Sequence, residues 1–291
     1  MNSNTELKQR KKGNADGILK AIYRFFQGML IGLGAVLPGI SGGVMCVVFG
    51  VYKPIMELLS NPFTAIKKYW QLLIPLILGG GTGFVAVSKL LGFLLEKYPE
   101  PSVCLFVGLI CGMLPSLFRE AGQKGRSKWS FVSMAVCFSL VLALLICIGA
   151  VHANITPNTL WYLFCGFCIA LSVIAPGMSF STLLMPLGLY TPLTVGIGNF
   201  DMRVIIPAGI GALITVILLA KAVTKLLDRH YSVVFHGIIG IVSAATIVII
   251  PFKSFAAGLV SFSVNAACLA VGAVIALLLD KFNSKVDVPE K

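Results

Sequence analysis

Two short Pro-Gly-x-Ser elements carry the residue types in this sequence that could bind an anion. The first contains Pro38, Gly39, Ser41, Gly42 and Gly43, and the second contains Pro176, Gly177, Ser179 and Ser181. Proline ends an incoming helix, glycine lets a ligand approach the backbone closely, and a serine can cap the following helix and offer its hydroxyl. Free amides at a helix N-terminus favour anions, phosphate above all. Each element is therefore predicted to bind phosphate, the alternative being a tight loop between membrane helices.

The two elements are copies within an internal repeat. At an offset of 138 residues, Pro38, Gly39 and Ser41 superpose on Pro176, Gly177 and Ser179. At an offset of 132 the repeat continues from Ile74 to Gly108, which superpose on Ile206 and Gly240. Each half holds about five apolar segments, an odd number, so the second half should lie upside down relative to the first. Inverted repeats of this kind build secondary transporters, in which interrupted or re-entrant helices of the two halves meet at the binding site.

Lys89 and Lys221 are equivalent in this repeat, and both lie inside apolar segments. Such lysines commonly extend along the helix to the membrane surface. The inverted topology gives the alternative, in which Lys89 and Lys221 are candidate site residues and each attracts an anionic head group on one side of the bilayer.

The elements that position these residues are membrane helices. The chain has 291 residues, of which 57% are hydrophobic and 12% charged, with a mean hydropathy of +0.94. Long apolar runs in lipid must be helical because every backbone polar group has to be satisfied internally. We expect an all-α polytopic membrane protein with about ten hydrophobic segments, at residues 18–37, 40–59, 71–95, 102–118, 129–151, 160–175, 179–197, 204–227, 233–250 and 255–279. The repeats should cover 18–151 and 159–279, between tails at 1–17 and 280–291.

The basic residues indicate topology rather than a nucleic-acid partner. The net charge of +12 comes from lysines and arginines in tails and connecting loops, including 119–128, whereas 152–158 has no formal charge. The positive-inside rule therefore predicts cytoplasmic N- and C-termini and an external loop at 152–158. Cys165 and Cys168 have no histidine or further cysteine at ligand spacing, so we expect neither a metal site nor a cofactor.

The paired motifs PGISGGVMCVVFGVY (38–52) and PGMSFSTLLMPLGLY (176–190) resemble the signatures of the bacterial polyprenyl-phosphate transporter family. The resemblance implies a transporter, not an enzyme, that returns undecaprenyl phosphate from the outer to the cytoplasmic leaflet of the bacterial cell membrane for cell-envelope synthesis. A coupling ion, proton or sodium, is compatible with it. The chain departs from the usual family pattern at Ala35, Val44, Lys53 and Phe180, where many members carry acidic residues, Thr or Gly.

Other functional classes fit the residues less well. Undecaprenyl-pyrophosphate phosphatases use a related PG-x-S-R-S motif, but Phe180 occupies the arginine position, and Glu57 and Glu96 lie at segment ends rather than in a central cluster. The sequence GGGTGF at 79–84 lacks the lysine of a P-loop. A channel or carrier for small solutes stays open, because scattered Ser and Thr could line an aqueous path.

Overall fold

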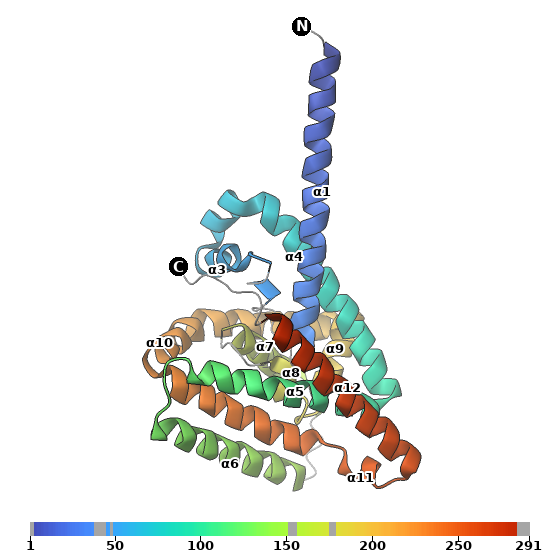
Figure 1. Ribbon diagram of the computed structural model, residues 1–291, viewed down its shortest axis with the longest axis vertical. Coiled ribbons are helices and arrows are strands. Elements are labelled where there is room, and N and C mark those ends of the chain that lie inside the picture. The colour runs from blue at the N-terminus through green and yellow to red at the C-terminus, as the bar shows by residue number, and fades with distance from the viewer. Residues whose placement is uncertain (1–2, 38–44, 47–48, 151–155, 175–178, 284–291) are drawn as a thin grey trace. The chain divides into compact units, whose positions relative to one another are not determined.

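The computed structural model describes residues 3–37, 45–46, 49–150, 156–174 and 179–283, and its regular elements in these ranges are helices (Figure 1). The predicted all-α class is confirmed. The helices with assigned bounds are α1 (Ser3–Val36), α3 (Tyr52–Ser60), α4 (Pro62–Lys97), α5 (Pro99–Gly122), α6 (Lys128–Ala150), α7 (Thr159–Ile174), α8 (Phe180–Leu184), α9 (Tyr190–Gly198), α10 (Met202–Ile249), α11 (Phe252–Phe255) and α12 (Leu259–Asn283).

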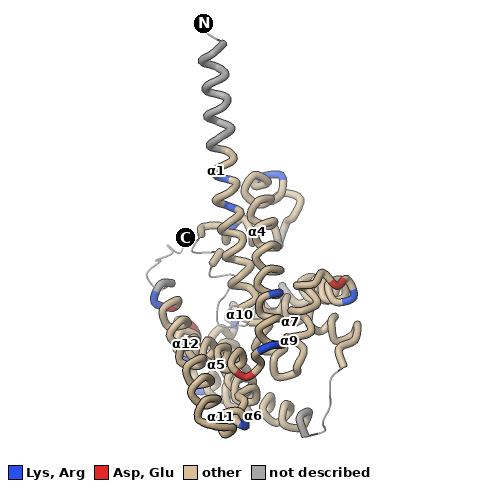
Figure 2. Tube along the Cα trace, turned by 90° about the vertical axis from the view of Figure 1, so that its right-hand side faces the viewer, with Lys and Arg blue, Asp and Glu red and all other residues tan. Residues whose placement is uncertain are grey.

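Seven stretches of the described helices are long and apolar enough to cross a membrane, two of them in α10, and the shorter apolar stretch Thr159–Ser172 lies in α7. Figure 2 shows long stretches of these helices without a charged residue. Leucine, isoleucine and valine side chains are exposed along α6, α10 and α12, as lipid-facing surfaces require. The chain is therefore a polytopic membrane protein.

Several predicted segments differ from the helices observed. Residues 179–197 form two short helices, α8 and α9, with a turn between them, and the described end of 40–59 belongs to the short helix α3. The segments 204–227 and 233–250 are parts of one helix, α10, which bends at His230 (φ −133°, ψ 41°). Helix α4 has a comparable break at Tyr69 (φ −120°, ψ 19°).

The chain forms two compact units. Unit 1 comprises Met1–Ala35 and Gly42–Ala86, and unit 2 comprises Val36–Ser41 and Val87–Lys291. These packing units do not coincide with the two halves of the sequence repeat, because most of the first half belongs to unit 2.

In unit 1, α1 and α4 pack backbone to backbone. A methyl group added to Gly28 would lie 2.1 Å from the Leu76 carbonyl oxygen, and one added to Gly79 would lie 1.9 Å from that of Phe25. Membrane helices use glycine in this way because lipid gives apolar side chains no reason to associate, so close van der Waals contact stabilises the pair. Beside this crossing, Cys46, Val51 and Leu76 form a small buried cluster.

In unit 2, α10 contacts α5, α6 and α7, while α12 packs on α5 (Figure 1). Glycines again mark the close crossings. A methyl group at Gly108 of α5 would lie 2.0 Å from the Leu269 oxygen of α12, and one at Gly240 of α10 would lie 2.3 Å from the Met134 oxygen of α6. Larger side chains fill the space between α5 and α10, where Leu117, Phe235 and Ile239 are buried together.

Candidate functional site

The second Pro-Gly-x-Ser element opens a helix–turn–helix between α7 and α10. Residues 175–178, which include Pro176 and Gly177, lie outside the described part of the chain. Ser179 is extended (φ −113°, ψ 137°) and directly precedes α8. The five-residue helix α8 ends in a turn because Gly188 adopts φ +70°, which glycine accepts without strain. The Leu189 amide donates to the Leu184 carbonyl at 3.0 Å, and α9 begins at Tyr190.

Two buried serine hydroxyls face each other at the start of this element. Ser179 Oγ and Ser181 Oγ are 2.7 Å apart, and both side chains are buried. Thr182 donates through Oγ1 to the Ser179 carbonyl at 2.6 Å. We expected the Ser179 hydroxyl to cap the outgoing helix, but it makes no capping hydrogen bond, because it pairs with Ser181 instead. When one hydroxyl donates to the other, one hydroxyl proton of the pair is left for a third group such as an anionic oxygen.

Tyr190 closes one side of the element. Its side chain is 1% exposed and contacts the rings of Phe180 and Phe106, with centroids 5.9 and 6.1 Å away. Its hydroxyl donates to the Val36 carbonyl at 3.1 Å. Val36 lies two residues before Pro38, so this bond ties the second element to the chain that leads into the first.

The first element itself, Pro38, Gly39, Ser41, Gly42 and Gly43, lies outside the described residues. The chain just after it has the same local fold as in the second half. Gly50 adopts φ +66°, like Gly188. The Val51 amide donates to the Cys46 carbonyl at 2.8 Å, as Leu189 does to Leu184, and α3 then begins at Tyr52, the equivalent of Tyr190.

The two predicted lysines lie in long helices, and no described contact joins Lys89 to the serine pair. Lys89 lies in α4 with an exposed side chain. Its backbone packs against α9, where a methyl group on Gly198 would lie 2.8 Å from the Lys89 Cα. Lys221 lies within α10, and its side chain is outside the description. Their role at an anion site stays a prediction.

A cavity of about 220 Å³ lies in unit 2 beside the α8–α9 turn. Leu95, Val103, Pro186, Tyr190 and Ile249 are among the residues that line it. Thr191 also lines it, so the cavity presents both aliphatic and polar surface.

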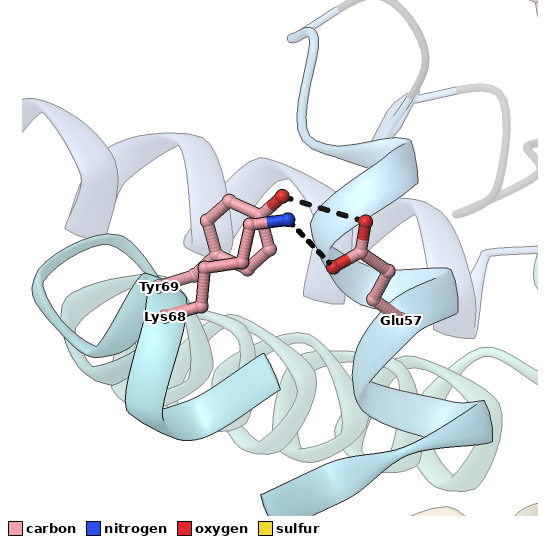
Figure 3. A network of polar contacts seen from close by, with 3 residues as sticks. All are labelled: Glu57, Lys68 and Tyr69. Carbon is pink, nitrogen blue, oxygen red and sulfur yellow. Dashed lines mark hydrogen bonds and ion pairs between the residues drawn. The ribbon is translucent and has the colours of Figure 1, made fainter. Parts of the chain in front are cut away.

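Glu57, which we considered as a potential catalytic carboxylate, takes part in a local network of unit 1. It accepts from Lys68 Nζ and from the Tyr69 hydroxyl, each at 3.4 Å (Figure 3). The Lys68 and Glu57 side chains are 56% and 32% exposed. Among the described residues no group of three or more His, Cys, Asp or Glu side chains is arranged to hold a metal ion.

Sequence reasoning missed two features of unit 2. Tyr190 ends the second motif as Tyr52 ends the first, and this identity at equivalent motif positions was the signal for a structural role. The sequence also gave no sign that Ser127, Ser130 and Ser232 form a hydrogen-bonded series that leads to His236.

The long apolar helices, packed closely at glycines, define the class, a polytopic membrane protein. The sequence profile of the undecaprenyl phosphate translocase-like family matches residues 31–267, and the chain belongs to that family. It is 24% identical over 243 residues to a polyprenyl-phosphate transporter of Vibrio cholerae serotype O1, covering 79% of this chain and 77% of the relative. It is 26% identical over 275 residues to a polyprenyl-phosphate transporter of Staphylococcus aureus, covering 89% and 96%. No solved structure matches the chain.

Proposed function

We propose that this protein transports undecaprenyl phosphate from the outer to the cytoplasmic leaflet of the bacterial cytoplasmic membrane, where the lipid carrier is reused in cell-envelope synthesis. Membership of a translocase-like family, with relatives named polyprenyl-phosphate transporters, supports the substrate class. The observation that carries the site is the buried Ser179–Ser181 hydroxyl pair at an interrupted helix.

The phosphate site combines both Pro-Gly-x-Ser elements. Ser179 and Ser181 donate to the phosphate from the second element, Ser41 donates from the first, and the glycines and prolines keep both backbones open to it. A phosphate in hydrocarbon without such donors costs many kcal/mol, so the head group needs a polar site to cross. Lys89 and Lys221 attract the anion at the two membrane surfaces.

The prenyl chain stays in the bilayer, which already solvates it. The cavity beside the α8–α9 turn lies along the same element as the serines, and its aliphatic lining residues suit the part of the chain nearest the phosphate. Both termini are cytoplasmic, as the distribution of basic residues predicts. The protein makes and breaks no covalent bond in this function.

The test is leaflet-to-leaflet transport of labelled undecaprenyl phosphate by purified protein in proteoliposomes. Replacing Ser41, Ser179 or Ser181 by Ala removes a hydrogen bond to a charged group, worth about 1.5–3 kcal/mol, so we expect affinity to fall about ten- to a hundredfold. Ser263→Ala is the matched control, because Ser263 is exposed and donates only to the Leu259 carbonyl of its own helix. Wild-type transport by all three site variants would show that the elements are structural turns.

The same preparation separates this function from its rivals. Release of inorganic phosphate from undecaprenyl pyrophosphate would identify a phosphatase, and passage of small ions with no lipid movement would identify a channel or small-solute carrier. We expect neither activity.

A further inference from the structure

A series of hydrogen-bonded hydroxyls leads from the surface of unit 2 to a buried histidine. Ser127, in the loop before α6, is exposed, and its Oγ lies 3.2 Å from Ser130 Oγ. Ser130 Oγ lies 3.0 Å from Ser232 Oγ on α10. Ser232 Oγ lies 3.4 Å from His236 Nδ1, one turn further along the helix. The series joins α6 to α10 across a separation of 102 residues.

His236 at the end of this series has an incomplete set of partners. It is 0% exposed, and its Nδ1 lies 2.7 Å from the Ser232 carbonyl oxygen. A contact this short needs a hydrogen on Nδ1, because the carbonyl can only accept. The other nitrogen, Nε2, is buried without a hydrogen-bond partner, and among described side chains only Ser88 Oγ shares that property. An unpaired buried polar atom lowers the stability of the fold by about 1–3 kcal/mol. A histidine that served only to fill space here would therefore destabilise the protein.

The surroundings of the imidazole are mainly aromatic. Phe131 of α6 and Phe118 of α5 meet its ring edge to face, with centroids 5.2 and 6.3 Å away.

The ionisable groups on the packed elements lie nearer the surface end of the series. On α5 and the loop after it these groups are Arg119, Glu120, Lys124 and Arg126, on α6 they are Lys128 and Cys137, and on α10 they are Arg229, His230 and Tyr231. Glu120 accepts from the Tyr231 hydroxyl, Lys124 lies over the Tyr231 ring, and Arg119 pairs with Asp280 of α12. Arg126 donates to the Phe118 carbonyl, and Cys137 lies beside Gly237. Among the described residues, no contact joins any of these groups to the His236 imidazole.

We propose that His236 is a proton-binding site that the serine series connects to water on the side of the membrane where Ser127 lies. In uptake, hydronium gives a proton to Ser127 Oγ and becomes water, while in the same concerted step hydroxyl protons shift from Ser127 to Ser130, from Ser130 to Ser232, and from Ser232 to Nδ1 of the Nε2–H tautomer. No alkoxide forms, and each serine ends with one proton. The product is an imidazolium whose Nδ1–H donates to the Ser232 carbonyl, a contact that the neutral Nδ1–H tautomer also makes.

This site gives the proposed transport function its coupling ion, and the inference rests on that function. A positive charge on His236 would lie buried between α5, α6 and α10. Its electrostatic interactions are strong there because the dielectric constant of a protein interior is low. The charge changes the relative stability of alternative helix packings, which is what an alternating transporter needs. Proton binding at His236 would thereby favour one orientation of the carrier over the other.

The proton site is tested first without transport. The chain has three histidines, so nitrogen-15 histidine spectra in lipid nanodiscs resolve few signals, and His236→Gln assigns one of them. We expect that signal to change from neutral imidazole to imidazolium between pH 9 and 5, and proton exchange at the ring to slow at least tenfold in Ser130→Ala. Ser232→Thr keeps a hydroxyl and should exchange like wild type. A His236 signal that keeps one protonation state from pH 5 to 9 overturns the proposal.

Coupling is tested by imposing a pH gradient on proteoliposomes that carry labelled undecaprenyl phosphate. We expect the gradient to change the wild-type transport rate severalfold and to leave the His236→Gln rate unchanged. His230→Gln is the matched control, since His230 is an exposed histidine on the same helix, and it should respond like wild type. An equal response of His236→Gln and wild type overturns the coupling role. If the wild type moves no lipid at all, the proposed function fails, while the histidine titration still decides the proton site.

Discussion

Two helix hairpins, α1 with α4 in unit 1 and α7 with α10 in unit 2, cross with the same backbone contacts at equivalent atoms. A methyl group added to Gly28 would contact the Leu76 oxygen and the Gly80 amide, and one added to Gly166 would contact the Ala208 oxygen and the Ala212 amide at the equivalent positions. A methyl group on Gly79 would likewise contact the Phe25 oxygen, and one on Gly211 the Leu163 oxygen. The sequence repeat is therefore a repeat of close backbone contacts as well.

The hairpins differ one turn further towards the Pro-Gly-x-Ser element. In unit 1, Gly32 and Gly83 continue the backbone contact, since added methyl groups would lie 2.1 and 2.2 Å from carbonyl oxygens of the opposite helix. In unit 2 their equivalents are Ala170 and Thr215, both buried. The two helices of unit 2 thus tolerate side chains where those of unit 1 do not, so the second hairpin is less tightly closed beside its element.

The helices after the two elements differ in polarity. Helix α3 carries Lys53 and Glu57, whereas α9 has Thr191 and Val195 at the equivalent positions. Tyr190 is buried and hydrogen-bonded, whereas Tyr52 is 44% exposed. The repeat has kept the turn and the helix length, and the side-chain chemistry has diverged.

The comparison treats the two halves as an inverted repeat. Labelling of single cysteines tests the inversion, and it has the largest expected effect. In a variant without the eight native cysteines, Gln123→Cys should react only with reagent on the cytoplasmic side and Thr156→Cys only with external reagent, because the basic loop is retained inside. The measurement is labelling by a membrane-impermeant maleimide in intact and opened cells. Labelling of both positions from one side would exclude the inverted repeat.

The shared crossing predicts matched losses of stability in the two halves. Gly28→Ala and Gly166→Ala each place a methyl group about 2 Å from a backbone oxygen, and we expect each to destabilise the fold by about 1–3 kcal/mol because the helices must separate. The measurement is thermal unfolding in detergent. Gly81→Ala and Gly209→Ala are controls on the partner helices α4 and α10, with nothing within 4 Å of the added methyl.

The difference between the hairpins predicts unequal losses at the next turn. Gly32→Ala should again be costly, whereas Ala170→Gly should cost only about 0.5–1 kcal/mol, the backbone entropy of a helical glycine. Equal losses at the two positions would mean that the second hairpin is as tightly closed as the first.

The polarity of α3 predicts the smallest effect. Glu57→Gln removes the ion pair with Lys68 and keeps an acceptor for Tyr69 (Figure 3). Because exposed ion pairs contribute little to stability, we expect the unfolding midpoint to stay within experimental error of wild type. A large fall would show that the network does more than join α3 to α4 at the surface.

The elements that sequence predicted well are those with a local signal. Apolar runs marked the helices, and the two Pro-Gly-x-Ser copies marked the breaks, because hydropathy and proline act on neighbouring residues. The break at His230 was read as the end of one segment and the start of another, although the helix continues through it with a bend. Hydropathy gives the length of an apolar run but not the backbone angle at its end.

Contacts between distant residues were beyond the same reasoning. Tyr190 donates to Val36 across 154 residues, and nothing near either residue indicates the other. The pairing of Ser179 with Ser181, in place of a helix cap, depends on the burial of both hydroxyls, which spacing does not reveal. Lys89 was noticed for its place in an apolar run, but the structure shows that its backbone, against Gly198, makes the close contact.

The pairing of α5 with α12 has a consequence for how the protein is made. Gly108 and Gly112 of α5 are covered by α12, which begins at Leu259, so a long stretch of chain must be synthesised before this face finds its partner. At about 5–20 residues per second the delay is roughly 10–30 s. During it α5 presents a glycine face in the membrane to which any helix with small residues could bind. Slow translation late in the chain should therefore favour mispaired protein over folded protein.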